Sequence, residues 1–165
     1  MKTGDRIPDV TATLDDGRTA TLSELLAHGP AVFFFYPKAF TPTCTAESCH
    51  FRDRAADFAA LGAQRFGVSR DGVSAQGAFR AQYGLDFPLI ADPDGAVAQA
   101  FGVKRLGPLP SKRHTFVVDR DRRVLGVIRS ELNAEIHADQ ALEILQAAPP
   151  AEIDLRDVEV TGEAG

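Results

Sequence analysis

The chain has 165 residues with 18 basic and 23 acidic side chains, a formal charge of −5. This balance argues against a nucleic-acid surface, because a domain that binds phosphates usually presents a basic face. The length suits one domain with a substantial core, and no apolar run is long enough to span a membrane. The N-terminus lacks the apolar core of a signal peptide, so we expect a cytoplasmic protein that binds no membrane.

The first predicted elements are a short helix and a buried strand. Thr21–Glu24 has the form of a capping box, and the following Gly29–Pro30 is a helix stop. The run Ala31–Tyr36 is rich in aromatic and β-branched side chains and has the length of a buried strand. Pro37 ends this strand, because proline cannot donate a hydrogen bond to a sheet ladder.

A helix is predicted directly after this strand. Thr41 suits the N-cap and Pro42 the first helical position, which places Cys44 third, inside the first turn. The thiol therefore faces the positive end of a helix dipole. We expect this helix to run as far as Gly62, because apolar residues recur with helical spacing at Phe51, Ala55 and Phe58.

The remaining elements continue the alternation. We expect strands at Arg65–Ser69 and Phe87–Ala91, helices ending at Gly84 and Phe101, a hairpin of Thr115–Val118 with Val124–Ile128, and a final helix from Asn133 to Gln146. This order predicts an α/β fold, a central mixed β-sheet flanked by helices, in a single domain of residues 1–147. Residues 148–165 follow as a short acidic C-terminal tail, which we expect to be disordered or loosely packed.

The spacing Pro37-x3-Thr41-x2-Cys44 after an apolar strand resembles the active-site signature of peroxiredoxins, thiol peroxidases with a thioredoxin-like fold. A second cysteine, Cys49, lies five residues further on, and this arrangement is similar to the Q-type (bacterioferritin-comigratory) subgroup. Residues 67–71, 87–95 and 113–119 also resemble family segments in the expected order. The resemblance covers roughly residues 1–147.

The resemblance implies a role for each residue of the site. Cys44 would be the peroxidatic nucleophile, Thr41 and Arg113 its activating partners, Pro37 a shield over the pocket and Cys49 the resolving thiol. It further implies a hydroperoxide substrate, a thioredoxin-like or glutaredoxin-like reductant, and no bound cofactor. A monomer or a weak dimer is the expected form.

Thiol chemistry indicates which partners matter most. Lowering a thiol pKa from about 8.5 to about 6 raises the thiolate fraction at pH 7 roughly thirty-fold. The same change lowers nucleophilicity roughly thirteen-fold, at a Brønsted coefficient of about 0.45, so the net gain is only about two-fold. Fast peroxide cleavage therefore needs preorganised donors for the departing oxygen, such as the Arg113 guanidinium and the Thr41 hydroxyl.

The spacing of the two cysteines predicts a conformational change. Five residues along a helix place their Cα atoms at least ~7.5 Å apart along the axis and about 140° apart around it, beyond disulfide reach. We therefore expect local unwinding around Cys44–His50 before Cys44 and Cys49 join. Two alternatives stay open: a one-cysteine peroxidase with an external resolving thiol, and a thioredoxin-fold redox sensor with slow turnover.

Five polar residues have a less specific interpretation. His50 follows Cys49, but two thiols and one imidazole lack a fourth ligand, so no metal site is expected. Glu47 is either a solvated helix charge or a member of the polar network around the pocket. The remaining histidines, His28, His114 and His137, are expected at the surface or at helix caps.

Overall fold

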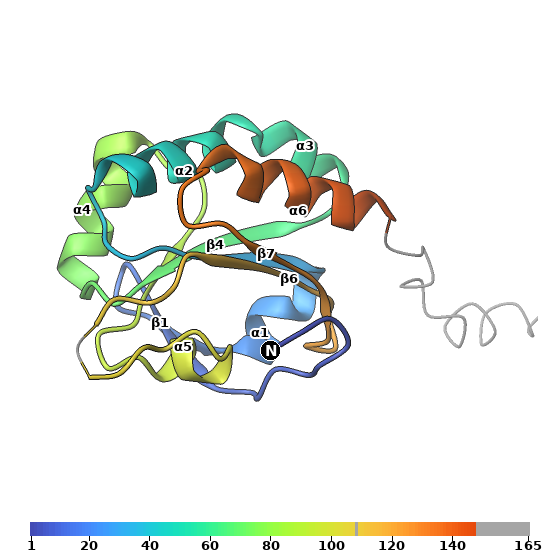
Figure 1. Ribbon diagram of the computed structural model, residues 1–165, viewed down its shortest axis with the longest axis horizontal. Helices are drawn as coiled ribbons and strands as arrows, with labels where there is room; N and C mark the ends of the chain where they lie inside the picture. Colours follow the sequence, from blue (N-terminus) through green and yellow to red (C-terminus); the bar gives the residue numbers. More distant parts are fainter. Residues whose placement is uncertain (108, 148–165) are drawn as a thin grey trace, which may run out of the picture.

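The computed structural model describes residues 1–107 and 109–147. In it, seven strands form one mixed sheet of order β2-β1-β5-β4-β3-β6-β7 (Figure 1). Strands β3, β4 and β5 are parallel, whereas β1, β2, β6 and β7 pair antiparallel with their neighbours. The strands are β1 (Thr11–Leu14), β2 (Thr19–Thr21), β3 (Ala31–Phe35), β4 (Gln64–Ser69), β5 (Leu89–Ala91), β6 (His114–Val118) and β7 (Val124–Arg129).

Helices cover both faces of this sheet (Figure 1). On one face lie α2 (Pro42–Asp53), α3 (Ala55–Ala60), α4 (Val73–Tyr83) and α6 (Glu135–Ala147). On the other lie α1 (Leu22–Leu25), a 3-10 turn at Leu26–His28, and α5 (Ala96–Ala100). The predicted α/β architecture is confirmed. The predicted tail, residues 148–165, lies outside the described residues, and within the described ones no helix is long and apolar enough to cross a membrane.

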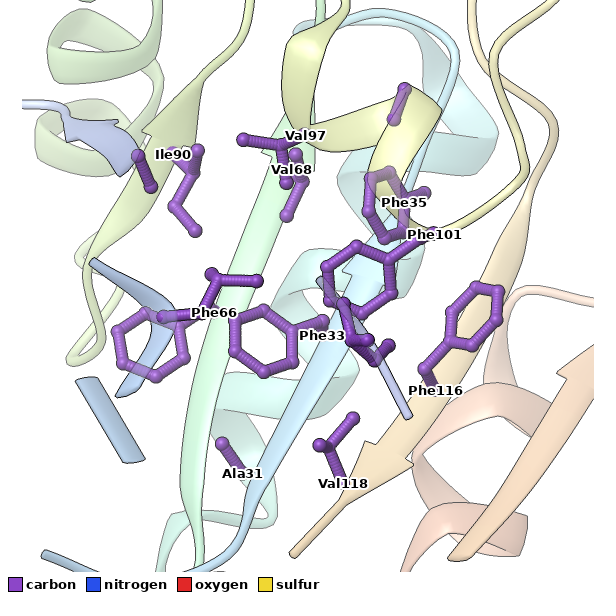
Figure 2. Close-up of a cluster of buried hydrophobic side chains, with 14 of the residues drawn as sticks. Ala31, Phe33, Phe35, Phe66, Val68, Ile90, Val97, Phe101, Phe116 and Val118 are labelled. Carbon is purple, nitrogen blue, oxygen red and sulfur yellow. The ribbon is translucent and has the colours of Figure 1, made fainter. Parts of the chain in front are cut away.

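Strand β3 connects two hydrophobic cores. Phe33 and Phe35 point into the core beneath α1 and α5, where Figure 2 shows them beside Phe101. Phe34 and Tyr36 belong to the opposite core, beneath α2, α4 and α6. Successive side chains of a strand alternate between faces, so a central strand covered on both sides is apolar throughout. The active-site loop thus follows directly from the most buried strand.

The N-terminal hairpin of β1 and β2 was not predicted. Its strands are short and carry threonines, so they lack the apolar run that identified β3. The turn between them contains Gly17 with a φ of 91°, which glycine adopts without strain. The Asp16-Gly17 dipeptide between two threonine-rich segments was the signal that could have identified this hairpin.

The prediction of a single helix from Thr41 to Gly62 is wrong, because the helix is interrupted at Arg54. This residue ends α2 and starts α3 with φ −97° and ψ 20°. Its guanidinium binds Asp57 at 2.6 Å and Asp139 of α6 at 2.6 Å. Both helices bury their aromatic residues in the same core, so the helical spacing of apolar residues continues across the interruption and gives no sign of it.

We expect Gly67→Ala to destabilise the fold. A Cβ atom at Gly67 of β4 would lie 2.8 Å from Leu89 Cδ2 and 2.9 Å from Phe34 Cζ, inside the packed core. Overpacking of this kind costs about 1–3 kcal/mol, measurable as a lower urea midpoint at constant m-value. Gly72→Ala is the matched control, because the described residues beyond its chain neighbours place no atom within 4 Å of the added methyl group, and the expected loss is about 0.5 kcal/mol. Equal losses in the two variants would contradict the packing argument.

Candidate active site

The loop between β3 and α2 is held by the neighbouring strand. Ala39 N–H donates to Asp71 Oδ2 at 2.8 Å, and the Ser69 hydroxyl donates to the same oxygen at 2.6 Å. Ser69 ends β4, which is parallel to β3, so both strands deliver their following residues to one edge of the sheet. Phe40 has a φ of 68°, in the left-handed region that few non-glycine residues adopt. The loop therefore has a defined conformation ahead of the helix.

The start of α2 is as predicted, with one difference in its hydrogen bonding. Thr41 is the N-cap, Pro42 the first helical residue and Cys44 the third. The Thr41 hydroxyl, however, donates to Lys38 O at 2.8 Å and makes no capping bond to the helix. Cys44 itself has no exposed surface. The first turn thus presents a thiol to the interior, while its threonine faces the loop.

Arg113 reaches Cys44 from the start of strand β6. It immediately precedes β6, which pairs with β3, and its side chain is buried. Its Nη2 donates to Cys44 Sγ at 3.2 Å, and its Nη1 donates to Glu47 Oε1 at 2.7 Å. Burial opposes the guanidinium charge, but Glu47 and Cys44 outweigh this effect and raise the pKa of Arg113. The cation is thus fixed between two groups on one helix face.

Glu47 belongs to the buried polar network rather than to the solvated helix face. It lies one turn after Cys44 and has no exposed surface. Burial raises its pKa to about 8, against the opposing effect of Arg113. Among the described residues only its Oε1 finds a hydrogen-bond partner, and Oε2 finds none. A carboxyl group in these surroundings favours its protonated form.

His137 of α6 is fully buried, so the predicted surface or capping position is wrong. Its Nε2 lies 2.7 Å from Ser130 O, and its Nδ1 lies 2.7 Å from Thr115 Oγ1. Nδ1 also faces Glu47 Oε2 at 3.6 Å. The signal that could have placed it inside is helical spacing, since it shares a stripe with Ala141 and Leu145 of the core.

Cys49 and Pro37 lie apart from these contacts. Cys49 is half-buried on α2, five residues after Cys44, and both thiols are free. Pro37 is half-buried and follows Tyr36 at the end of β3. The structure brings Cys44, Arg113 and Glu47 together at hydrogen-bond distance. It leaves Cys49 further along the same helix, where a disulfide with Cys44 requires the helix to open.

The chemistry of the site comes from a thiol and a guanidinium. Across the ranges 1–107 and 109–147, no three His, Cys, Asp or Glu side chains are grouped so that they could hold a metal ion. What the site does hold is a buried thiol at the positive end of a helix, with a guanidinium donor aimed at its sulfur. Such a thiol is a nucleophile, and such a donor stabilises negative charge on the sulfur or on an oxygen beside it.

A reactive thiol on this mixed sheet defines a thiol-based redox protein, and sequence comparison assigns it to a family. Residues 3–127 match the model of the AhpC/TSA family, so the chain belongs to that family. The crystal structure of peroxidoxin BcpB from Mycobacterium tuberculosis is similar at 50% identity and a TM-score of 0.87, covering 90% of this chain and 99% of that one.

Two further relatives agree. The bacterioferritin comigratory protein of Xanthomonas campestris is 33% identical with a TM-score of 0.77, covering 87% of this chain and 98% of that one. The chloroplastic peroxiredoxin Q of Populus jackii is 35% identical over 146 residues, covering 87% of this chain and 68% of its own length. The expected Q-type peroxiredoxin subgroup and thioredoxin-like fold are thereby confirmed.

Proposed function

We propose that this chain is a thiol-dependent peroxidase that reduces hydrogen peroxide and organic hydroperoxides, with Cys44 as the attacking thiol. The observation that carries the proposal is the 3.2 Å hydrogen bond from Arg113 Nη2 to the sulfur of a fully buried Cys44. The Xanthomonas campestris relative is described by its alkyl peroxide reduction activity, which supports organic hydroperoxides as substrates.

The reaction begins with attack of the Cys44 thiolate on the terminal oxygen of the hydroperoxide. The sulfur–oxygen bond forms as the oxygen–oxygen bond breaks, and the electron pair leaves with the second oxygen as hydroxide or alkoxide, which then takes up a proton. Cys44 becomes a sulfenic acid. Arg113 stabilises the developing charge because its guanidinium is already placed at the sulfur and has further N–H groups for oxygen.

Thr41 and Pro37 complete the proposed pocket. The Thr41 hydroxyl now donates to Lys38 O, and it needs only to rotate to donate to or accept from a peroxide oxygen. Pro37, half-buried between Tyr36 and the loop, restricts the access of water to the sulfur.

Cys49 is the proposed resolving thiol. Its sulfur attacks the sulfenic sulfur of Cys44, the disulfide forms and water leaves. For this the first turns of α2 must unwind. The next turn stays anchored, because Phe51 O accepts from Arg65 Nη1 at 2.8 Å and His50 Nε2 lies 2.8 Å from Asp139 Oδ1. Cys44 therefore moves towards Cys49.

A dithiol protein of thioredoxin or glutaredoxin type then reduces the disulfide, in a reducing compartment such as the cytoplasm. The monomeric or weakly dimeric state stays a prediction.

The test compares peroxide consumption with dithiothreitol as the reductant. We expect Cys44→Ser to abolish turnover, because no other nucleophile lies at Arg113. Cys49→Ser, oxidised before dithiothreitol is added, should stop at a sulfenic acid that a dimedone probe traps, since its internal resolving thiol is gone and no external thiol is present. Stoichiometric oxidation of the wild type without turnover would favour a redox sensor. A dimedone-reactive sulfenic acid in the wild type oxidised without reductant, with no Cys44–Cys49 disulfide, would indicate a one-cysteine peroxidase.

A further inference from the structure

Two buried titratable side chains, Glu47 and His137, take no part in the proposed reaction steps. Glu47 Oε1 accepts from Arg113, but Glu47 Oε2 is inaccessible to solvent and has no hydrogen-bond partner within residues 1–107 and 109–147. The basic atom that faces it is His137 Nδ1, 3.6 Å away, and neither side chain has any exposed surface. An ionised carboxylate oxygen left unpaired in the interior is strongly unfavourable, so a proton belongs at this position.

The hydrogen bonds of His137 are compatible with two positions for this proton. Its Nε2 must carry a hydrogen, because its partner at 2.7 Å, the Ser130 carbonyl oxygen, only accepts. Its Nδ1 is paired with the Thr115 hydroxyl, which can either donate to a bare nitrogen or accept from a protonated one. A proton can therefore reside on Glu47 Oε2 or on His137 Nδ1 without breaking either of the imidazole's hydrogen bonds.

We propose that Glu47 and His137 act as one buried acid that holds a single proton, which makes His137 a positioning residue for the Cys44 site. With the proton in place the pair is neutral, and the positive charge of Arg113 is left for the sulfur and the reacting oxygens. When the proton is lost, the Glu47 carboxylate competes with the thiolate for the same guanidinium. The proposal rests on the proposed function of Cys44 as the attacking thiol.

The charges around the pair are consistent with this arrangement. Arg113 lies on one side of the pair, hydrogen-bonded to Glu47 and Cys44, and Glu131 precedes α6. His114 of β6 points to the opposite face of the sheet, beside Phe116. Burial raises the pKa of Glu47 to about 8, with Arg113 opposing and Glu131 adding to the shift. Burial lowers the pKa of His137. The proton is thus retained through neutral pH.

The pH dependence of Cys44 oxidation tests the pair. In a Cys49→Ser background, which leaves a single thiol, the second-order rate with hydrogen peroxide should rise as the thiol ionises. It should then fall above about pH 8, because loss of the shared proton places a negative charge beside Arg113. Glu47→Gln keeps an acceptor for Arg113 and stays neutral at every pH, so we expect its profile to have no falling limb.

His137→Gln isolates the histidine. The glutamine amide can still donate towards Ser130 but offers no basic nitrogen, so the remaining carboxyl holds its proton less tightly. We expect the falling limb to move towards acid by about one pH unit, with a rate at pH 8.5 roughly five- to tenfold lower. In the Glu47→Gln background the same change should alter the rate less than about two-fold. A tenfold effect that persists there would overturn the proposal, because it would show that His137 acts without Glu47.

NMR spectra of the protein with both residues intact provide a test that depends neither on the folding of the variants nor on peroxide turnover. Carboxyl ¹³C and imidazole ¹⁵N spectra of the reduced chain should show one proton on the pair at pH 6.5, either as a neutral Glu47 carboxyl or as a His137 imidazolium. An ionised Glu47 beside a neutral His137 at that pH would overturn the proposal. Absence of any peroxide reaction, with the proton present, would instead refute the proposed function alone.

Discussion

Replacement of Arg113 by alanine is expected to lower the rate of Cys44 oxidation by about 100- to 1,000-fold. The guanidinium is the one side-chain donor at the sulfur that the described residues provide, at 3.2 Å, and it is held in place by its second bond to Glu47. A gain in ionisation alone changes thiol reactivity only about two-fold, so the loss should persist at a pH where the thiol is fully ionised. Stopped-flow measurement of the second-order rate with hydrogen peroxide over a range of pH separates the two effects.

Two further variants sharpen this measurement. Arg113→Lys keeps the positive charge but lacks the planar fork that reaches Cys44 and Glu47 together, so we expect a loss of intermediate size. Arg123→Ala is the matched control, because Arg123 is exposed and, in the described part of the chain, its side chain donates to Gly4 O alone, at 3.2 Å. A loss of only a few-fold in Arg113→Ala at saturating pH would show that the donors matter less than the thiolate fraction.

Local rules of sequence were enough to place the thiol. An apolar run, a proline and an N-cap threonine are adjacent in the chain, and together they predicted both β3 and the position of Cys44 in the first turn of α2. The pairing of β3 with β6 brings Arg113 to this thiol from 69 residues away. The contact between Arg113 and Cys44 depends on the order of the strands in the sheet. The hydrophobic periodicity of the sequence does not determine that order, so the contact was predicted from the family resemblance.

The missed features have physical reasons of a different kind. His137 is polar, and the expectation of an exposed side chain followed from residue type, whereas its helical stripe pointed inwards. Strand β1 is short and lies near the edge of the sheet, so it does not require a continuous apolar run. In both cases contacts with residues distant in sequence determine the structure. Ser130 and Thr115 form hydrogen bonds with the buried imidazole, and β5 pairs with β1 in the sheet.

A matched pair of core variants should separate global stability from the local stability of α2. Phe33 and Phe34 are both fully buried in β3 but face opposite cores. Replacement of either by alanine is expected to cost about 3–5 kcal/mol, measured by urea unfolding. Phe34 is stacked on Phe51 of α2 with ring centroids 4.1 Å apart, whereas Phe33 is stacked on Phe66 at 5.2 Å. Only Phe34→Ala therefore removes a packing contact of α2, the helix that must unwind before the disulfide can form.

Native-state hydrogen exchange resolves the difference, because amides that exchange through local opening respond only to local supports. In Phe34→Ala we expect faster exchange throughout α2, together with faster closure of the Cys44–Cys49 disulfide after oxidation. In Phe33→Ala the exchange of α2 by local opening should stay unchanged. If the alanine variants unfold, Phe34→Leu and Phe33→Leu offer the same comparison with smaller losses. Equal acceleration of α2 exchange in both variants would mean that this helix opens only when the whole domain unfolds, which would rule out local unwinding as the route to the disulfide.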